Sequence, residues 1–191
     1  MRSITPIIIL ISLILISCND VKVPKPRGYF RIDLPEHTYM NFDSAALPYR
    51  FEMPTYARVE PDHSYDAEPH WINIKFPYFK SQIHVTYRNI NGIVDAALED
   101  SRKLVYEHTV KADAIGENIY ANDSLRVFGE LYEIKGNAAT PLQFALTDST
   151  KHLFRGSLYF YCVPNKDSLA PVSEFLEEDI AHLIETFSWK E

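Results

Sequence analysis

The chain has 191 residues, a formal net charge of −7 and 13% aromatic residues. This length is sufficient for one domain with a substantial hydrophobic core. The negative charge argues against nucleic-acid binding and against broad adhesion to anionic lipid, because both need a basic surface.

The start of the chain has the parts of an export signal. A short basic start precedes an apolar run from Ile4 to Ile16, which is shorter than the roughly 20 apolar residues of a membrane-spanning helix. The order Leu15-Ile16-Ser17-Cys18 resembles the bacterial lipobox, whose cysteine thiol receives a diacylglyceryl group before the peptide is cut in front of it. An ordinary secretory signal would leave Cys18 without a role, and an uncleaved anchor helix would need an apolar continuation.

We therefore predict a signal peptide at residues 1–17, a lipidated Cys18 with a tether to residue 28, and one globular domain at residues 29–191. Pro24 and Pro26 favour an extended tether. The basic residues of the tether either attract it to an anionic leaflet or only keep it solvated. Acylation of Cys18 would leave Cys162 without a disulfide partner, and we predict that Cys162 is a buried core residue.

Alternating apolar and polar residues predict several strands in the first half of the domain. The first three are each stopped by a proline and lie at 29–34, 49–53 and 57–60. A polar loop at 62–70 follows them. Residues 71–76 and 83–87 alternate most clearly, and we predict that they pair as a hairpin.

The second half begins with the spacing of an amphipathic helix at residues 93–108, with Asn91 as the predicted N-cap. Residues 111–122 fit either a second short helix or a loop. Strands are predicted at 125–134, 142–147 and 153–163, and the last has apolar residues on both faces, as an interior strand does. An apolar stripe from Val172 to Phe187 predicts a closing helix.

The order strands, helix, strands, helix predicts an α+β fold, with a mostly antiparallel sheet and two main helices packed on it. The final half, three strands and a helix that ends near Trp189, loosely resembles the PsbP/Mog1-like fold.

The candidates for a metal site are Asp62 and four further residues of the polar loop, His63, Asp66, Glu68 and His70. Imidazole and carboxylate groups are zinc ligands, but this spacing matches no known motif, and a solvated loop has the same composition. No Gly-x-Ser-x-Gly elbow and no glycine-rich phosphate loop occurs in the sequence. We therefore predict no catalytic residue, no metal and no cofactor, and a protein that is not an enzyme.

Two segments carry a resemblance to a known family. Residues 24–34 read PKPRGYFRIDL, and residues 48–52 read PYRFE. Together with the lipobox-like end at Cys18 and the closing residues 183–187, they resemble the gliding motility lipoprotein GldD family of Bacteroidetes-type bacteria.

The resemblance implies a lipid-anchored, non-enzymatic component of the gliding motility machinery that supports type IX protein secretion. It implies acylation of Cys18 and other envelope machinery proteins as partners. The residues after Cys18, Asn19-Asp20-Val21-Lys22, do not form an acidic surface-export signal, so we expect a periplasm-facing place on the outer membrane. The alternative is a lipid-anchored periplasmic protein that binds a small ligand or a cell-wall fragment, because the 12 Tyr and 11 Phe residues could line a pocket.

Overall fold

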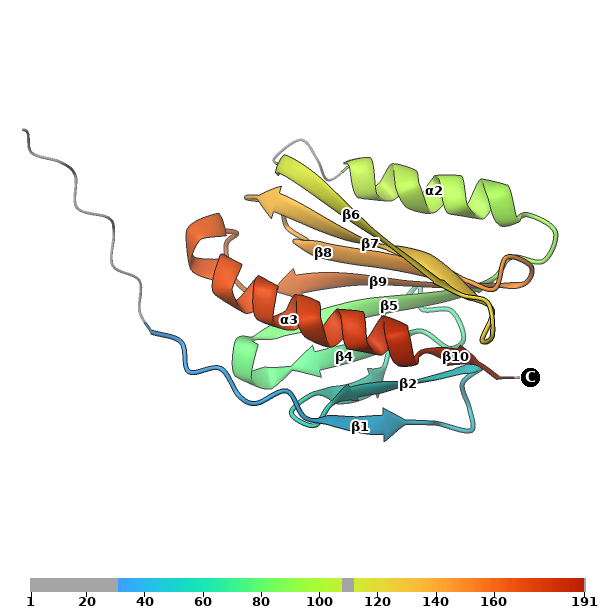
Figure 1. Cartoon of the computed structure of the whole chain (residues 1–191), viewed down its shortest axis with the longest axis horizontal. Coiled ribbons are helices and arrows are strands. Elements are labelled where there is room, and N and C mark those ends of the chain that lie inside the picture. Colours follow the sequence, from blue (N-terminus) through green and yellow to red (C-terminus); the bar gives the residue numbers. More distant parts are fainter. Residues whose placement is uncertain (1–30, 108–111, 191) are drawn as a thin grey trace, which may run out of the picture. The chain divides into compact units, whose positions relative to one another are not determined.

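The structure is a computed structural model that describes residues 31–107 and 112–190 (Figure 1). The chain divides into two compact units, Met1–Ile32 and Asp33–Glu191, and every strand and helix described belongs to the second. The predicted signal peptide, Cys18 and the tether lie outside the described residues.

Seven strands form one sheet in which all neighbours are antiparallel. In order across the sheet they are β3 (Arg58–Pro61), β4 (Ile72–Phe76), β5 (Ser81–Asn89), β9 (His152–Phe160), β8 (Leu142–Thr147), β7 (Val127–Gly136) and β6 (Ala112–Asn122). Two meanders, β3–β5 and β6–β9, join where β5 pairs with β9. A small antiparallel sheet has the order β1 (Tyr39–Phe42), β2 (Tyr49–Pro54), β10 (Ser188–Trp189).

The predicted hairpin is confirmed. In β4 and β5, Ile72 lies opposite Val85 and Ile74 opposite Ile83, and both strands bury alternate residues. The short 3-10 helix η1 (Pro77–Phe79) connects them, and Lys80 follows it with a positive φ of 48°. Alternation is clear here because one face of both strands packs on the main core.

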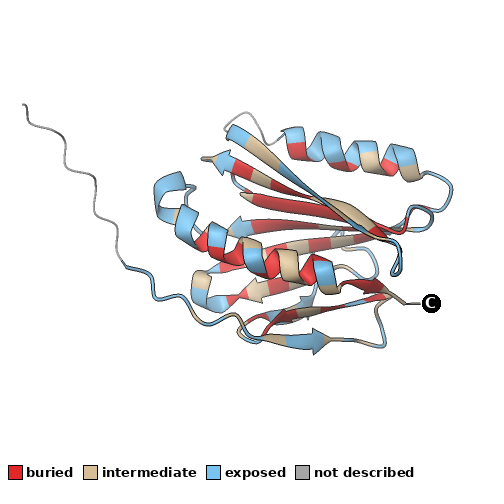
Figure 2. Ribbon diagram, in the orientation of Figure 1, coloured by how far each residue is buried: buried red, intermediate tan, exposed pale blue. Residues whose placement is uncertain are grey.

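The main core lies between one face of the large sheet and a layer made of β2 and the helix α3 (Lys166–Thr186). Figure 2 shows buried positions that recur along α3 with exposed positions between them. The predicted closing helix is confirmed, and its buried apolar residues are Val172, Phe175, Leu176, Ile180, Leu183 and Ile184. The helix begins earlier than the stripe, because the side chain of Asn165 caps it by accepting the N–H of Ser168.

Packing of the Phe144 ring against the backbone of the neighbouring strand requires a glycine at residue 156. Gly156 of β9 lies opposite Phe144 of β8. A Cβ atom at residue 156 would lie 2.3 Å from two carbons of the Phe144 ring. The ring therefore occupies the space that any larger residue at this position would need.

The helix α2 (Val94–Glu107) covers part of the opposite face of the sheet. Phe144 and Leu146 belong to the main core, whereas Ala145 packs with Ala97 of α2, and successive strand residues point to opposite faces. Among the residues described, neither α2 nor α3 is long and apolar enough to cross a membrane.

The predicted start of the α2 helix is wrong. The helix begins at Val94, three residues after Asn91, and the N–H of Asn91 donates to Oδ1 of Asn89 in a turn. Its buried stripe is also narrower than predicted, because Ile93 and Leu104 are exposed. The predicted helical residue His108 lies outside the described residues.

Three further predictions differ from the structure. Residues 31–34 form no strand, and the first strand, β1, begins only at Tyr39; residues 29 and 30 are outside the described residues. The ambiguous segment 111–122 contains the strand β6, whose mostly exposed residues give no clean alternation. Cys162 is exposed, because β9 ends at Phe160 and the chain then leaves the sheet.

Candidate functional site

The polar loop between β3 and β4 ties one of its candidate ligands into the sheet. Oδ1 of Asp62 accepts the N–H of Ser64 at 2.9 Å, and Oδ2 lies 3.2 Å from Nε2 of His84 in β5. Burial would raise the pKa of Asp62, but the hydrogen bonds from Ser64 and the nearby His84 outweigh it and lower the pKa. Asp62 therefore serves as an acceptor for its own loop.

The other four candidates are exposed loop residues, namely His63, Asp66, Glu68 and His70. Nδ1 of His70 lies 3.1 Å from the carbonyl oxygen of Ala46, and its ring meets the ring of Tyr87 edge-on. Within residues 31–107 and 112–190, no group of three or more His, Cys, Asp or Glu side chains could hold a metal ion. The structure thus does not bring these candidates together around one point.

Asp179 is a buried carboxylate on α3 that faces three polar groups from the N-terminal part of the domain. The residue is 2% exposed. Its Oδ1 accepts the hydroxyl of Tyr39 at 3.1 Å and lies 2.8 Å from Nδ1 of His37, and its Oδ2 accepts the hydroxyl of Tyr56. Burial, and after it the charge of Asp179, raises the pKa of Tyr39 to about 12, so its hydroxyl remains a donor at neutral pH. We call Asp179, His37, Tyr39 and Tyr56 the Asp179 cluster.

Aromatic stacking holds the Asp179 cluster against the helix. The ring of His37 stacks on Phe175 with centroids 4.2 Å apart, and the ring of Tyr39 stacks on His182 at 3.6 Å. Nε2 of His182 in turn lies 2.7 Å from Oε2 of Glu52 in β2. Because the carboxylate is enclosed and already accepts hydrogen bonds, the cluster fastens β1 and the residues before it to α3.

Sequence reasoning missed the Asp179 cluster, although one signal was present. Asp179 lies three residues after Leu176 and four before Leu183, so it falls on the apolar stripe of the closing helix. A carboxylate on a buried stripe needs partners, because burying it without hydrogen bonds is costly. The distant partners, such as Tyr39 and Tyr56, could not be identified without the fold.

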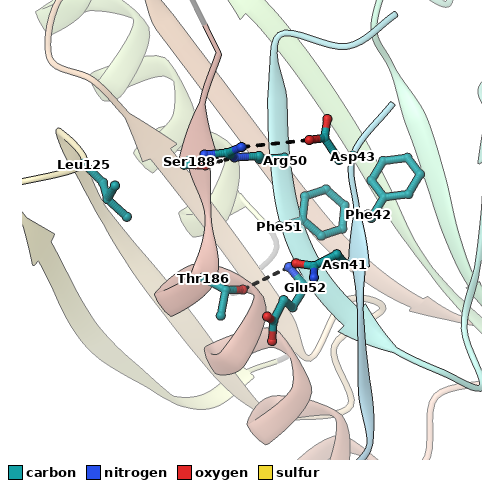
Figure 3. Close-up of a pocket in the computed structure, with 9 residues that line it drawn as sticks. All are labelled: Asn41, Phe42, Asp43, Arg50, Phe51, Glu52, Leu125, Thr186 and Ser188. Carbon is teal, nitrogen blue, oxygen red and sulfur yellow. Dashed lines mark hydrogen bonds and ion pairs between the residues drawn. The ribbon is translucent and has the colours of Figure 1, made fainter. Parts of the chain in front are cut away.

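A pocket of about 520 Å³ opens beside this region, between the small sheet, the end of α3 and the turn that holds Leu125 (Figure 3). Nε of Arg50 donates to Oγ of Ser188 at 2.9 Å, and the N–H of Glu52 donates to Oγ1 of Thr186 at 3.0 Å. Figure 3 shows Arg50 also directed toward Asp43. These polar groups form hydrogen bonds and an ion pair with one another. The pocket therefore presents a concave surface with charges of both signs and no unpaired reactive group among these residues.

A second pocket of about 540 Å³ lies between α2 and the strands β6, β7 and β8. Its apolar lining includes Leu98, Ile119 and Phe128, and its polar lining includes Arg102 and Glu130. Nη2 of Arg102 lies 3.5 Å from Oε1 of Glu130. Both pockets have the size of ligand sites, but this one borders the edge strand β6 and is therefore open to a neighbouring chain.

Ser157 and Cys162 carry side chains that could act as nucleophiles. Ser157 is 7% exposed, and its Oγ lies 3.4 Å from Oε1 of Gln143, an amide oxygen that cannot act as a strong base. Cys162 is exposed.

The protein has similarities to known proteins in structure and in sequence. The structure is similar to the solution structure of cyanobacterial PsbP (CyanoP) from Synechocystis sp. PCC 6803, with a TM-score of 0.47 and 11% sequence identity over 84% of this chain and 97% of that chain. The comparison with curated proteins gives no match.

The family described as gliding motility lipoprotein GldD matches residues 19–189. The chain therefore belongs to the gliding motility lipoprotein GldD family.

Proposed function

We propose that the protein is a lipid-anchored, non-enzymatic component of the gliding motility machinery in the cell envelope and that it supports type IX protein secretion. The observation that carries this proposal is the family match over residues 19–189, which begins directly after the lipobox-like order Leu15-Ile16-Ser17-Cys18. In this proposal Cys18 carries the lipid and residues 19–28 are the tether.

A lipid on Cys18 would keep the domain at a membrane surface. One acyl chain gives only reversible binding, whereas two or more anchor a protein stably. Of the residues after Cys18, Asn19-Asp20-Val21-Lys22, only Asp20 is acidic, so they do not form an acidic signal for export to the cell surface. We therefore propose the outer membrane, with the domain facing the periplasm.

The described surface favours a role in protein association over catalysis. The buried carboxylate Asp179 bonds to the protein's own tyrosines, and the polar groups of the pocket around Arg50 bond to one another. A small charged ligand would have to break such bonds before it gained new ones. The partners in this proposal are other envelope proteins of the gliding and secretion machinery.

Metabolic labelling with a fatty acid tests the anchor. In cells that lack their own copy, the wild-type chain should be labelled and should restore gliding and secretion, whereas Cys18→Ala should be unlabelled and should fail to restore them. Cys162→Ala is the matched control, because it removes the other cysteine of the chain, which is exposed, and should behave like wild type.

The possible results separate the parts of the proposal. Labelling of Cys18→Ala at the wild-type level would contradict the lipidation site. An unlabelled Cys18→Ala chain that still restores gliding would contradict the need for an anchor. Protease digestion of intact and permeabilised cells locates the domain, and cleavage in intact cells would contradict the periplasmic orientation.

A further inference from the structure

The two edges of the seven-stranded sheet are built differently. The edge strand β3 has four residues and ends in Pro61, which has no N–H group to donate. The other edge strand, β6, has 11 residues, and its sequence contains no proline, lysine or arginine. Short length, proline and lysine are the features by which natural sheets prevent further pairing at an edge. β3 has two of these features, and β6 has none.

The strand β6 is also accessible along its length. In the part of the chain that the structure describes, β6 pairs only with β7, and none of its residues is buried. Every other strand of six or more residues contains buried positions. A bulge near Asp113 interrupts the pairing only at the start, and residues 114–122 then pair regularly with residues 127–135. Along this regular run, alternate N–H and C=O groups point away from β7.

An added strand would find an apolar contact on one face. Ile115 packs with Val105 of α2, and Ile119 lies on the same side of β6 because side chains alternate along a strand. Ile119 is 79% exposed, although it lines the 540 Å³ pocket beneath α2. A large apolar residue at an open edge, next to the apolar part of this pocket, suits the alternate side chains of an extended segment.

The charges around this edge select the partner. Three carboxylates and one guanidinium line the pocket, from Asp95, Glu99, Glu130 and Arg102. β6 itself carries Asp113 and Glu117. Asp113 is ion-paired with Lys166 of α3, whose Nζ lies 2.6 Å from its Oδ2. Pairing of β6 with β6 of a second copy would bring together the two Glu117 carboxylates with no basic residue on either strand, which is destabilising where they lie opposite each other.

In an added strand whose apolar residues lie beside Ile119, the alternate residues face the other side of the sheet. On that side, the carboxylate of Glu133 in β7 lies beside Gly116, and the charges of Glu177 and Glu185 in α3 act on Tyr120 of β6. Basic residues at those alternate positions would therefore be attracted.

We propose that β6 is a docking edge that adds an extended segment of another protein, in which apolar residues alternate with lysine or arginine. The segment forms main-chain hydrogen bonds with β6 and places its apolar side chains beside Ile119. The inference does not depend on the proposed lipid anchor.

A peptide as long as β6, in which valine and lysine alternate, tests this edge directly. Binding to the full chain in mild detergent is measured by fluorescence anisotropy, and hydrogen exchange locates the bound peptide. We expect the peptide to bind and to slow the exchange of β6 amides. A peptide in which glutamate replaces lysine should bind about tenfold more weakly or worse, because its carboxylates would lie on the same face as those of Glu133, Glu177 and Glu185.

Two variants complete the test. Ile119→Lys places a positive charge at the exposed centre of the edge and should weaken binding of the lysine peptide by about tenfold. Met40→Lys makes the same kind of change at another exposed strand residue, which is 45% exposed, and should leave binding unchanged. The chain with Cys18→Ala should bind as wild type does, so a failed anchor and a failed docking edge are distinguishable.

Several results would overturn the proposal. The first is the absence of binding by the lysine peptide, and the second is equal binding by the lysine and glutamate peptides. Protection that appears at β3 or β1 but not at β6 would place the contact elsewhere. Concentration-dependent dimerisation that protects β6 and is abolished by Ile119→Lys would identify a second copy as the occupant. Circular dichroism melts of both variants establish that any loss of binding is not a loss of folding.

Discussion

The Asp179 cluster makes a quantitative prediction about stability. Asp179→Ala removes one acceptor that Tyr39 and Tyr56 share and that also faces His37. A buried donor left without an acceptor costs about 1–3 kcal/mol. Both tyrosines are only half-buried, so the lower part of that range applies to each. Relief of the buried charge returns part of the loss, and we expect a net cost of about 1–3 kcal/mol out of a typical total of about 5–15 kcal/mol.

The assay is unfolding by urea of a chain that begins at Tyr29. Tryptophan fluorescence monitors the unfolding, and the free energy of unfolding is obtained from the titration. The neighbouring Glu178→Ala is the matched control, because its side chain is 72% exposed although it lies 3.1 Å from Nε2 of His37. This variant should change the free energy of unfolding by no more than about 0.5 kcal/mol. Asp179→Asn keeps the size and one oxygen, and it should fall between the two.

If Asp179→Ala proves no more destabilising than Glu178→Ala, the reasoning is refuted. The hydroxyls of Tyr39 and Tyr56 would then reach water in the variant, and the cluster would contribute nothing beyond packing. A second check separates these contributions, because Tyr56→Phe keeps the ring and removes only one hydrogen bond. It should cost about 1 kcal/mol.

Two further predictions concern other parts of the domain. Leu183 in α3 is 2% exposed, so Leu183→Ala should cost about 2–5 kcal/mol of folding free energy and lower the melting temperature by roughly 4–20 °C. Leu125 is 42% exposed, so Leu125→Ala should have little effect. Equal melting temperatures of the two variants would show that α3 does not pack on the sheet. Burial opposes ionisation of Asp148, but hydrogen bonds from Thr150 and the following N–H groups hold its pKa well below the ordinary value of 3.8. The folded state therefore binds this proton less readily than the unfolded state, the stabilisation is complete above about pH 4, and it is lost as the pH falls further. Asp148→Asn should give a shallower loss of stability in acid, and an unchanged acid limb in urea titrations would contradict this.

The elements that the sequence predicts correctly are those whose buried residues recur at one regular spacing. The hairpin of β4 and β5 and the helix α3 each bury one regular face, so alternation or helical spacing is visible in the residues themselves. The strand β6 has no buried face, and its sequence therefore carries no period that could reveal it. The two-residue strand β10 depends wholly on pairing with β2, a distant segment.

Burial of single residues was harder to predict than the elements. Cys162 follows an apolar run, which suggested a core position, but the run extends beyond the last paired residue, Phe160. Asp179 shows the reverse, because a charged residue is buried where its partners come from more than a hundred positions away. In both cases the outcome depends on where a strand ends or which segments meet, and local spacing does not contain that information.

The Asp179 cluster and the proposed docking edge lie in different parts of the domain. The cluster fastens His37 and Tyr39 to α3 beside the small sheet. The edge strand β6 belongs to the second meander of the large sheet, and its face toward α2 is the opposite of the face that packs on α3. A segment added to β6 therefore displaces no contact of the Asp179 cluster. For that reason, loss of the cluster should weaken folding without changing which segment β6 selects, and blocking of β6 should abolish docking while the domain keeps its stability.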